Sequence, residues 1–224
     1  MQTTIQFKHN ANATVYPFDS LDELAARTAH HLHNKTVGLS GGSTFRHLFP
    51  LWIYNHPDCR QTAFFPVDER MVPFEDHRSN WGTAYRLFFK PLGKQAEKSH
   101  FASSVKIYKQ ILDSFFETRP PVFDVIFLGV GGDGHTASLF PNQPYLSDRS
   151  STVLQTISPV APFDRITLAP RVLIAARKLI TIVGGAEKKD IVKGIFQKNG
   201  SLPIVRILSE HPASLLYVDK QIMP

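Results

Sequence analysis

The sequence predicts an α/β fold with a mainly parallel sheet. Short apolar runs typical of buried strands alternate with segments in which apolar residues recur three and four positions apart, as on one face of a helix. Neither a repeat nor a linker long enough to divide the chain interrupts this alternation, so we expect one domain over residues 1–224. The segments that we expect to form strands are residues 35–39, 62–67, 123–129, 152–157, 165–169, 179–183 and 215–218.

Capping signals locate the helices between these strands. Ser20 and Glu23 have the spacing of a capping box, in which each side chain accepts a hydrogen bond from a free backbone N–H of the first turn. Ser79, followed by Asn80, is placed to cap another helix, and Pro170 suits a first turn because the N–H that it lacks has no partner there. The segments that we expect to be helical are residues 21–32, 79–89, 103–117, 186–197 and a short one from residue 170.

Composition narrows the class of protein. With 224 residues, of which 42% are hydrophobic, the chain is long enough for a sizeable core. No apolar stretch approaches the roughly 18–20 residues of a membrane helix, and the start MQTTIQFKHN lacks the pattern of a signal peptide. The single cysteine, Cys59, excludes an internal disulfide and a thiolate zinc site. We therefore expect a cytoplasmic enzyme or binding protein.

The charge balance favours a small anionic ligand. The chain has 25 Lys and Arg against 19 Asp and Glu, a formal net charge of +6. These charges are scattered, and the densest cluster is the pair Lys188 and Lys189. Because nucleic-acid-binding proteins usually concentrate basic residues on one stripe or run, we expect no nucleic acid and no membrane as partner.

Three loops rich in polar and glycine residues follow predicted strands. They are Ser40–Thr44 (SGGST), the charged turn Asp68–Arg70 (DER) and Gly131–His135 (GGDGH). Ligands of open α/β sheets bind beyond the carboxyl ends of the strands. We therefore expect the three loops to build one site.

The first of these loops has the composition of an anion-binding site. Gly41 and Gly42 let backbone N–H groups approach a ligand, while Ser43 and Thr44 add hydroxyls at the start of a helix. A tight turn with an ordinary helix cap would contain the same residues. The loop alone leaves both interpretations open.

The third loop contains a candidate base beside a misleading glycine pattern. Gly129, Gly131 and Gly134 match G-x-G-x-x-G, but prolines stop any following helix early and no acidic residue follows at the distance that a dinucleotide site requires, so we expect no nicotinamide cofactor. Asp133 and His135 have the chemistry of a general base held by a carboxylate. A capping aspartate beside a structural histidine is the alternative.

A cluster of histidines suggests a metal site at first sight. His30, His31 and His33 lie in a predicted surface helix without carboxylate partners. We therefore expect a solvated helix face there and no metal.

Four blocks of the sequence resemble the 6-phosphogluconolactonase family. They are LSGGSTFRHL, FFPVDERMVPFEDHRSNWG, FDVIFLGVGGDGHTASLFP and RITLAPRVLIAARKLITIVGGAEKK, and the likeness runs from about residue 20 to 219. The resemblance implies a modified Rossmann-like α/β fold, as in glucosamine-6-phosphate deaminases and ribose-5-phosphate isomerases. It also implies hydrolysis of 6-phospho-D-glucono-1,5-lactone to 6-phospho-D-gluconate in the oxidative pentose phosphate pathway, without cofactor or metal. We expect a monomer or a homodimer.

The resemblance further implies where the substrate phosphate binds. The Gly41–Thr44 loop would hold the phosphate, and Arg165 and Lys188 would neutralise it. One departure from the family pattern lies beside this loop, because Phe45 stands where a proline is usual.

The resemblance also implies how the lactone is opened. His135 would take a proton from water while Asp133 holds the imidazole. Arg70 would face the sugar or the lactone oxygens, and either Arg70 or the backbone N–H groups of Gly131–Gly134 would stabilise the oxyanion. Asp68 would order its loop or contact substrate hydroxyls.

Two other functions compete with this one. A deaminase or isomerase of the glucosamine-6-phosphate type carries a glutamate five positions after the histidine, where this chain has Phe140. A non-catalytic sugar-phosphate regulator would be expected to lose Asp133 or His135 and to carry a DNA-binding module, for which this chain has no spare length. The resemblance and these residues favour the lactonase.

Overall fold

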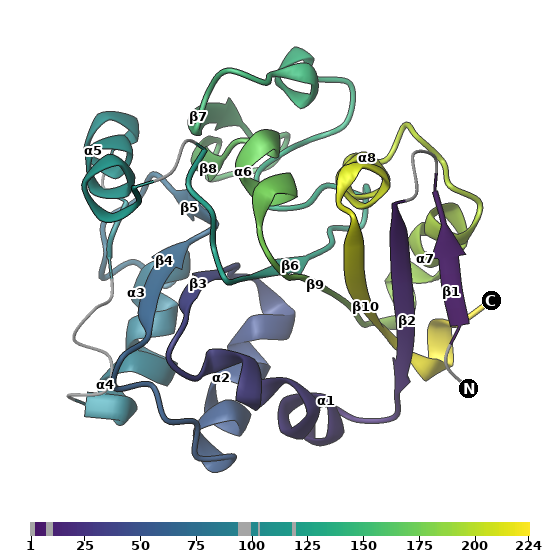
Figure 1. Ribbon diagram of the computed structural model, residues 1–224, viewed down its shortest axis with the longest axis horizontal. Coiled ribbons are helices and arrows are strands. Elements are labelled where there is room, and N and C mark those ends of the chain that lie inside the picture. The colour runs from purple at the N-terminus through teal and green to yellow at the C-terminus, as the bar shows by residue number, and fades with distance from the viewer. Residues whose placement is uncertain (1–2, 8–10, 94–99, 103, 118–119) are drawn as a thin grey trace.

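The computed structural model describes residues 3–7, 11–93, 100–102, 104–117 and 120–224, with a seven-stranded sheet at its centre (Figure 1). The strands follow the order β1-β2-β10-β9-β6-β3-β4, and all neighbours are parallel except β1 and β2. The strands are β1 Thr3–Gln6, β2 Asn12–Phe18, β3 Thr36–Leu39, β4 Ala63–Pro66, β6 Val125–Gly129, β9 Leu179–Val183 and β10 Ala213–Asp219. The predicted α/β class with a mainly parallel sheet is confirmed.

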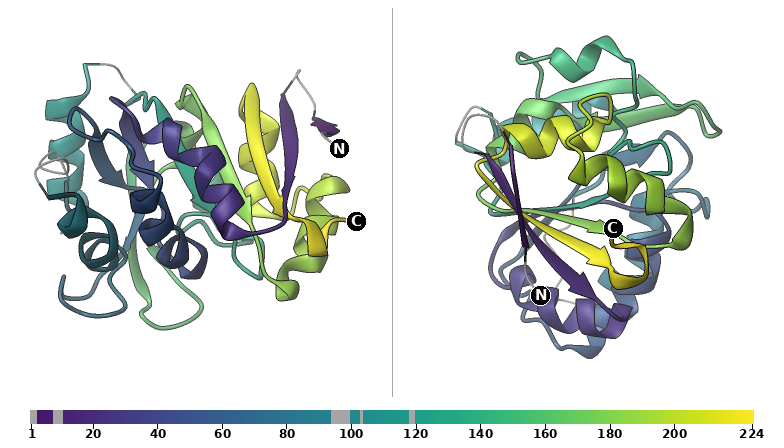
Figure 2. Two further views of the ribbon diagram at one scale, coloured as in Figure 1. Left: turned by 90° about the horizontal axis from the view of Figure 1, so that it is seen from below. Right: turned by 90° about the vertical axis from the view of Figure 1, so that its right-hand side faces the viewer.

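Helices cover both faces of this sheet (Figure 2). Buried side chains of α1, α2 and α3 share a cluster with Phe127 of β6, whereas those of α5, α6, α7 and α8 share another with its neighbour Leu128. Burial on both faces explains why β6 is a continuous apolar run. The helices are α1 Leu21–Thr28, α2 Ser43–Tyr54, α3 Asn80–Ala84, α4 Lys90–Leu92, α5 Val105–Phe115, α6 Pro170–Ala175, α7 Lys189–Phe196 and α8 Pro203–Glu210.

Short turns of other helix types complete the chain. A π-helical turn, Tyr85–Phe89, joins α3 to α4. The 3-10 turns are Ala29–Leu32, Pro144–Ser147, Ala186–Lys188 and Lys220–Ile222. In the part of the chain that the structure describes, none of the helices is both long and apolar enough to cross a membrane.

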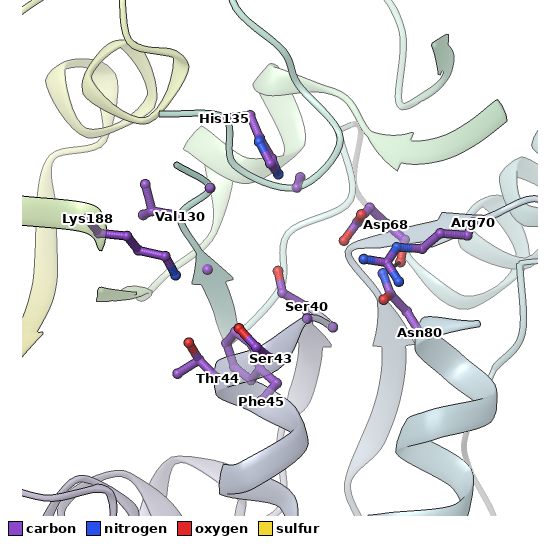
Figure 3. Close-up of a pocket in the computed structure, with 15 residues that line it drawn as sticks. Ser40, Ser43, Thr44, Phe45, Asp68, Arg70, Asn80, Val130, His135 and Lys188 are labelled. Atoms are coloured by element: carbon purple, nitrogen blue, oxygen red, sulfur yellow. Dashed lines mark hydrogen bonds between the residues drawn. The ribbon is translucent and has the colours of Figure 1, made fainter. Parts of the chain in front are cut away.

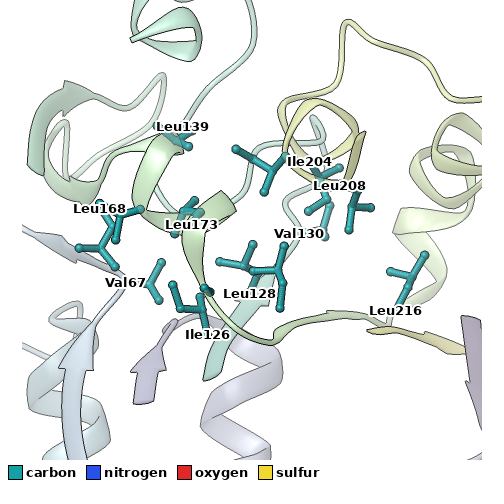
Figure 4. Close-up of a cluster of buried hydrophobic side chains, with 14 of the residues drawn as sticks. Val67, Ile126, Leu128, Val130, Leu139, Leu168, Leu173, Ile204, Leu208 and Leu216 are labelled. Carbon is teal, nitrogen blue, oxygen red and sulfur yellow. The ribbon is translucent and has the colours of Figure 1, made fainter. Parts of the chain in front are cut away.

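A second, three-stranded antiparallel sheet lies beside the first. Its order is β5 Asp68–Arg70, β8 Asp164–Leu168 and β7 Val153–Ile157. Leu168 of this sheet and Val67 pack in the same apolar cluster as Ile126 and Leu128 of the central sheet (Figure 4). The two sheets therefore share one core.

The expectation that Asp68–Arg70 forms a charged turn is wrong. These residues form β5, in which Asp68 pairs with Thr167 and Arg70 with Arg165 of β8. Three successive charged residues are poor strand formers by composition, but the backbone pairing with β8 overrides that preference.

The N-terminal strands β1 and β2 and helix α8 lie outside the predicted elements. β2 contains Asn12 and Pro17, which occur rarely in strands. It forms nevertheless because it pairs with β10 in parallel from Asn12 to Phe18. Tertiary pairing again decides the outcome.

The predicted helix starts are confirmed at three places. The Ser20 hydroxyl accepts from the N–H of Glu23 at 3.2 Å, while Glu23 accepts from the N–H of Asp19 at 2.7 Å. The Ser79 hydroxyl accepts from the N–H of Gly82 at 2.9 Å, and Pro170 begins α6. The helix expected over 103–117 begins at Val105, and residue 103 lies outside the described residues.

Candidate active site

A pocket of about 220 Å³ opens at the carboxyl ends of β3 and β6 (Figure 3). The structure brings together here the three loops that the sequence analysis singled out, although they lie far apart in the chain. The pocket is lined by Ser40, Gly41, Gly42, Ser43, Thr44, Phe45, Asp68, Arg70, Asn80, Gly129, Val130, Gly131, His135, Ala137 and Lys188.

The loop between β3 and α2 forms the floor of this pocket. A Cβ atom on Gly41 would lie 2.1 Å from Oδ1 of Asn80, so only glycine leaves room for that amide. Gly42 has a φ of +93°, in the left-handed region that favours glycine. Because α2 begins at Ser43, the free N–H groups of its first turn lie at the pocket, at the positive end of the helix dipole. The Ser40 hydroxyl is buried there, and it has no hydrogen-bond partner in the part of the chain that the structure describes.

Lys188 supplies a positive charge to the same pocket from the segment that follows β9. It ends the 3-10 turn that follows β9, and it is only 9% exposed. Among the described residues its ammonium group has no hydrogen bond or ion pair. Burial lowers the pKa of this ammonium, and the carboxylate of Glu187 opposes that effect. A buried ammonium without a partner beside a helix N-terminus is a site for an anion.

Asp133 and His135 form a pair at the end of β6. The Oδ1 atom of Asp133 lies 2.5 Å from Nδ1 of His135 and also accepts from the His135 backbone N–H at 3.0 Å. Burial opposes the ionisation of Asp133, but the hydrogen bonds from the side chain and backbone of His135 lower its pKa overall. The ionised carboxylate therefore holds Nδ1 as a hydrogen-bond donor, and Nε2 is left to accept a proton.

Gly131 makes room for the imidazole of His135. A Cβ atom at this position would lie 2.1 Å from Cε1 of His135. The turn itself is closed by hydrogen bonds from the Gly131 N–H to the His135 carbonyl at 2.9 Å and from the Gly134 N–H to the Gly131 carbonyl at 3.0 Å. Gly131 thus leaves the space that the histidine ring occupies. The glycines of this loop are followed by irregular structure up to the turn at Pro144, not by the helix of a dinucleotide site.

Asp68 and Arg70 reach the pocket from β5. The Asp68 carboxylate accepts a hydrogen bond from the Ser138 hydroxyl at 2.7 Å, and its backbone carbonyl accepts from the Asn80 amide at 3.1 Å. Arg70 donates from Nη1 to the carbonyl of Arg78 at 2.7 Å, while its Nε is buried without a partner. Both side chains are thus held from outside the pocket.

Glu69, between them, is a residue that the sequence analysis missed. Its side chain points away from the pocket and is 1% exposed. It accepts from the N–H groups of Arg70, Asn80 and Trp81 at 2.7, 2.7 and 2.8 Å and from the Ser79 hydroxyl at 3.0 Å. Glu69 therefore ties β5 to the first turn of α3. Interpreting DER as a strand would have indicated this role, because successive side chains of a strand point to opposite faces and the middle one would then point away from the pocket.

The structure places Arg165 next to the pocket that contains Lys188. It is absent from the pocket that contains Lys188 and the Gly41–Thr44 loop, and it lines an adjoining cavity of about 380 Å³ with Asp133 and Ser158. Its Nη2 donates to the Ser158 hydroxyl at 3.3 Å. The two cations expected on one phosphate thus line adjoining cavities that share Asp68, Arg70, His135 and Ala137, and the pairing of β8 with β5 places Arg165 beside Arg70.

The histidine cluster is also arranged differently from the expectation. His31 lies in a 3-10 turn and is only 7% exposed, so the expected solvated face is wrong for this residue. His33 accepts from the N–H of Asp58 through Nε2 at 3.0 Å. Over the described ranges, no group of three or more His, Cys, Asp or Glu side chains is arranged to hold a metal ion.

An imidazole oriented by a carboxylate, next to a helix N-terminus and a buried lysine, is typical of an acid–base enzyme for a small anionic substrate. Comparison with known families specifies which one. The chain belongs to the glucosamine-6-phosphate isomerase and 6-phosphogluconolactonase family, whose model matches residues 18–217.

Similar proteins occur in a bacterium, a mammal and a protozoan. The 6-phosphogluconolactonase of Borreliella burgdorferi is 30% identical over 195 residues, which cover 81% of this chain and 82% of that protein. The 6-phosphogluconolactonase of Bos taurus is 34% identical over 209 residues, 81% of this chain and 76% of that protein. The solved structure of 6-phosphogluconolactonase from Trypanosoma cruzi is 26% identical and superposes with a TM-score of 0.79 over 97% of both chains. The predicted family is confirmed.

Proposed function

We propose that this chain hydrolyses 6-phospho-D-glucono-1,5-lactone to 6-phospho-D-gluconate, with His135 as general base. The observation that supports this best is that His135, held by Asp133, lines the same pocket as the α2 N-terminus and Lys188. The His135 imidazole activates water, and the α2 N-terminus together with Lys188 binds a phosphate. Hydrolysis of a phosphorylated lactone requires both functions. The named relatives, all 6-phosphogluconolactonases, support the same substrate.

In this mechanism the proton moves through Nε2 of His135. As Nε2 takes a proton from water, the water oxygen bonds to C1 of the lactone and the carbonyl oxygen becomes an oxyanion. When the oxyanion collapses, the bond between C1 and the ring oxygen breaks, and the imidazolium returns the proton to that oxygen. The carboxylic acid that results loses its proton to solvent. Asp133 keeps Nδ1 in the donor state and stabilises the imidazolium throughout.

The remaining residues of the pocket bind and polarise the substrate. The N–H groups of Gly42, Ser43 and Thr44, together with Lys188, hold the phosphate. Arg70 faces the lactone oxygens, where its unpartnered Nε is available to stabilise the oxyanion.

A deaminase or isomerase function is less well supported. Such an enzyme needs a further acid or base for ring opening, and the position five residues after His135 holds Phe140. Its ring centroid lies 4.9 Å from that of His135. An apolar ring cannot transfer a proton.

We further propose that the enzyme acts in the cytoplasm as a monomer or homodimer, without a cofactor or nucleic acid.

The test is the hydrolysis of freshly prepared 6-phosphogluconolactone, measured against its spontaneous hydrolysis. Unphosphorylated gluconolactone is the control for the role of the phosphate. We expect a rate far above the spontaneous one, with a strong preference for the phosphorylated lactone. A protein that binds the sugar phosphate but leaves the spontaneous rate unchanged would instead be a regulator that shares the fold.

A further inference from the structure

Arg70 and Arg165 lie side by side on adjacent strands of the three-stranded sheet. They are register partners on the antiparallel strands β5 and β8, so their side chains leave the same face. Both line the adjoining cavity of about 380 Å³, which shares Asp68, Arg70, His135 and Ala137 with the first pocket. The two cavities thus meet at His135.

Both arginines have hydrogen-bonding capacity that the protein leaves unused. Arg165 is 6% exposed, and its buried Nε has no hydrogen-bond acceptor within the ranges that the structure describes. The Nε of Arg70 is likewise buried, and the described residues offer it no hydrogen-bond acceptor. Among the described residues, neither guanidinium lies within ion-pair distance of a carboxylate.

This arrangement is electrostatically unfavourable without an anion. Burial and the positive charge of Arg70 lower the pKa of Arg165, and the nearby carboxylates of Asp68 and Glu69 only partly oppose them. Glu69 is committed to the first turn of α3, and Asp68 accepts from Ser138. An anion between the two guanidinium groups would relieve their repulsion and use the free N–H groups.

The phosphate of the substrate has a site elsewhere. The α2 N-terminus and Lys188 line the first pocket and not the adjoining cavity, and Figure 3 shows Lys188 and Arg70 on opposite sides of that pocket with His135 between them. The phosphate is ionic throughout the reaction, whereas the group at C1 gains its negative charge during it. It is a neutral carbonyl in the lactone, an oxyanion in the tetrahedral intermediate and a carboxylate in the product.

We propose that Arg165 and Arg70 together form a subsite for the C1 oxygens, in which Arg165 binds the product carboxylate and not the phosphate. This inference rests on the proposed function and adds the orientation of the substrate, with the phosphate toward Lys188 and C1 toward β5 and β8. Because the negative charge at C1 appears only as the reaction proceeds, the subsite binds the transition state more tightly than the substrate.

The test compares two ligands that differ only at C1. D-Glucitol 6-phosphate has the carbon chain and phosphate of 6-phospho-D-gluconate but a hydroxymethyl group in place of the carboxylate. Dissociation constants for both are measured by calorimetry on the wild type, Arg165→Gln and Lys188→Gln. We expect Arg165→Gln to weaken 6-phosphogluconate about ten- to a hundredfold, the range for a charge-assisted contact, and to leave glucitol 6-phosphate nearly unchanged. Lys188→Gln should weaken both ligands to a similar extent.

Kinetics give a second, independent readout. Arg165→Gln should lower kcat for the lactone with little change in KM, because the contact forms only as charge develops. An equal loss of affinity for both ligands would overturn the inference, since Arg165 would then hold the phosphate. So would unchanged affinity for both.

Separate controls test whether the variant is folded and whether the protein hydrolyses the lactone. Retained affinity for glucitol 6-phosphate shows that the variant is folded, and Arg165→Lys, which keeps the charge but loses the fork of N–H donors, serves if Arg165→Gln is unstable. Arg165→Lys should still weaken 6-phosphogluconate selectively. A wild type that binds both ligands without hydrolysing the lactone would contradict the proposed function but not the subsite. A wild type that hydrolyses it while Arg165→Gln weakens both ligands equally would contradict the subsite alone.

Discussion

The hydroxyl of Ser138 donates a hydrogen bond of 2.7 Å to the carboxylate of Asp68, joining β5 to the segment after His135, 70 positions further along the chain. Ser138 is only 1% exposed, and its own N–H and carbonyl are bonded to the hydroxyls of Thr167 and Thr156. The donor is therefore fixed in place. It sets the direction in which the Asp68 carboxylate faces the pocket.

Ser138→Ala should destabilise the protein and lower kcat/KM for the lactone. The substitution removes the one side-chain hydrogen bond that Asp68 makes among the described residues, and losing a buried bond to a charged group costs about 1.5–3 kcal/mol. Urea denaturation measures the free energy of unfolding. Ser209→Ala, which removes a hydroxyl bonded to the Arg206 carbonyl on α8, is the matched control. Equal effects of the two variants would contradict the role given to Ser138.

His135→Ala should lower kcat by about 10²–10⁴-fold, the usual effect of losing a general base. The His135 side chain is 33% exposed, so its removal should leave the melting temperature nearly unchanged. Turnover is measured with fresh 6-phosphogluconolactone after subtraction of the spontaneous rate. His77→Ala, at a side chain that is 86% exposed and outside the pocket, is the control. Turnover near that of the wild type would exclude His135 as the base.

Gly131→Ala should impair catalysis by displacing the imidazole. The added Cβ would lie 2.1 Å from a ring atom of His135, whereas a Cβ on the adjacent Gly132 would meet nothing within 4 Å. We therefore expect a loss of kcat for Gly131→Ala that approaches the loss for His135→Ala, and a much smaller loss for Gly132→Ala. Comparable losses in the two glycine variants would show that the imidazole position does not depend on Gly131.

Lys188→Ala should weaken only the phosphorylated substrate. If its ammonium binds the phosphate, kcat/KM for 6-phosphogluconolactone should fall about ten- to a hundredfold, the range for one charge-assisted bond. Hydrolysis of unphosphorylated gluconolactone should barely change. Lys189→Ala, at the exposed neighbouring position, should alter neither rate. Equal losses on both lactones would assign Lys188 to the fold or to the chemistry.

His31 should make the protein less stable in acid. Burial, with the positive charges of His30 and Lys178, lowers the pKa of His31 to about 3 in the folded protein. The unfolded chain takes up a proton below its ordinary pKa of about 6.5, so stability is lost as the pH falls from 6.5 toward 3, by at most about 1.4 kcal/mol per pH unit.

His31→Phe should remove this part of the pH dependence. Urea denaturation at pH 7 and pH 4.5 should show a smaller difference for the variant than for the wild type. His77→Phe, at an exposed position, should keep the difference of the wild type. An unchanged difference in His31→Phe would mean that other groups govern the acid sensitivity.

Much of the fold follows from local sequence. The run before Gly129 is apolar at every position because β6 is buried on both faces, and Ser20 and Ser79 cap helices through bonds that span only three positions. Asp133 and His135 are two positions apart, so a tight turn suffices to bring the carboxylate to the imidazole. Each of these features depends on neighbours within one turn or one strand, and periodicity and residue type report such neighbours directly.

Only the tertiary structure decided which distant residues share a cavity. Asp68–Arg70 becomes a strand because β8 pairs with it, and that register, not the composition of either segment, places Arg165 beside Arg70 in the cavity that adjoins the Lys188 pocket. Ser138 reaches Asp68 because its N–H is bonded to Thr167 of β8, the residue that pairs with Asp68. The pairing of two strands depends on the packing of the whole core, and the pattern along a single strand shows which face is buried but not which strand lies beside it.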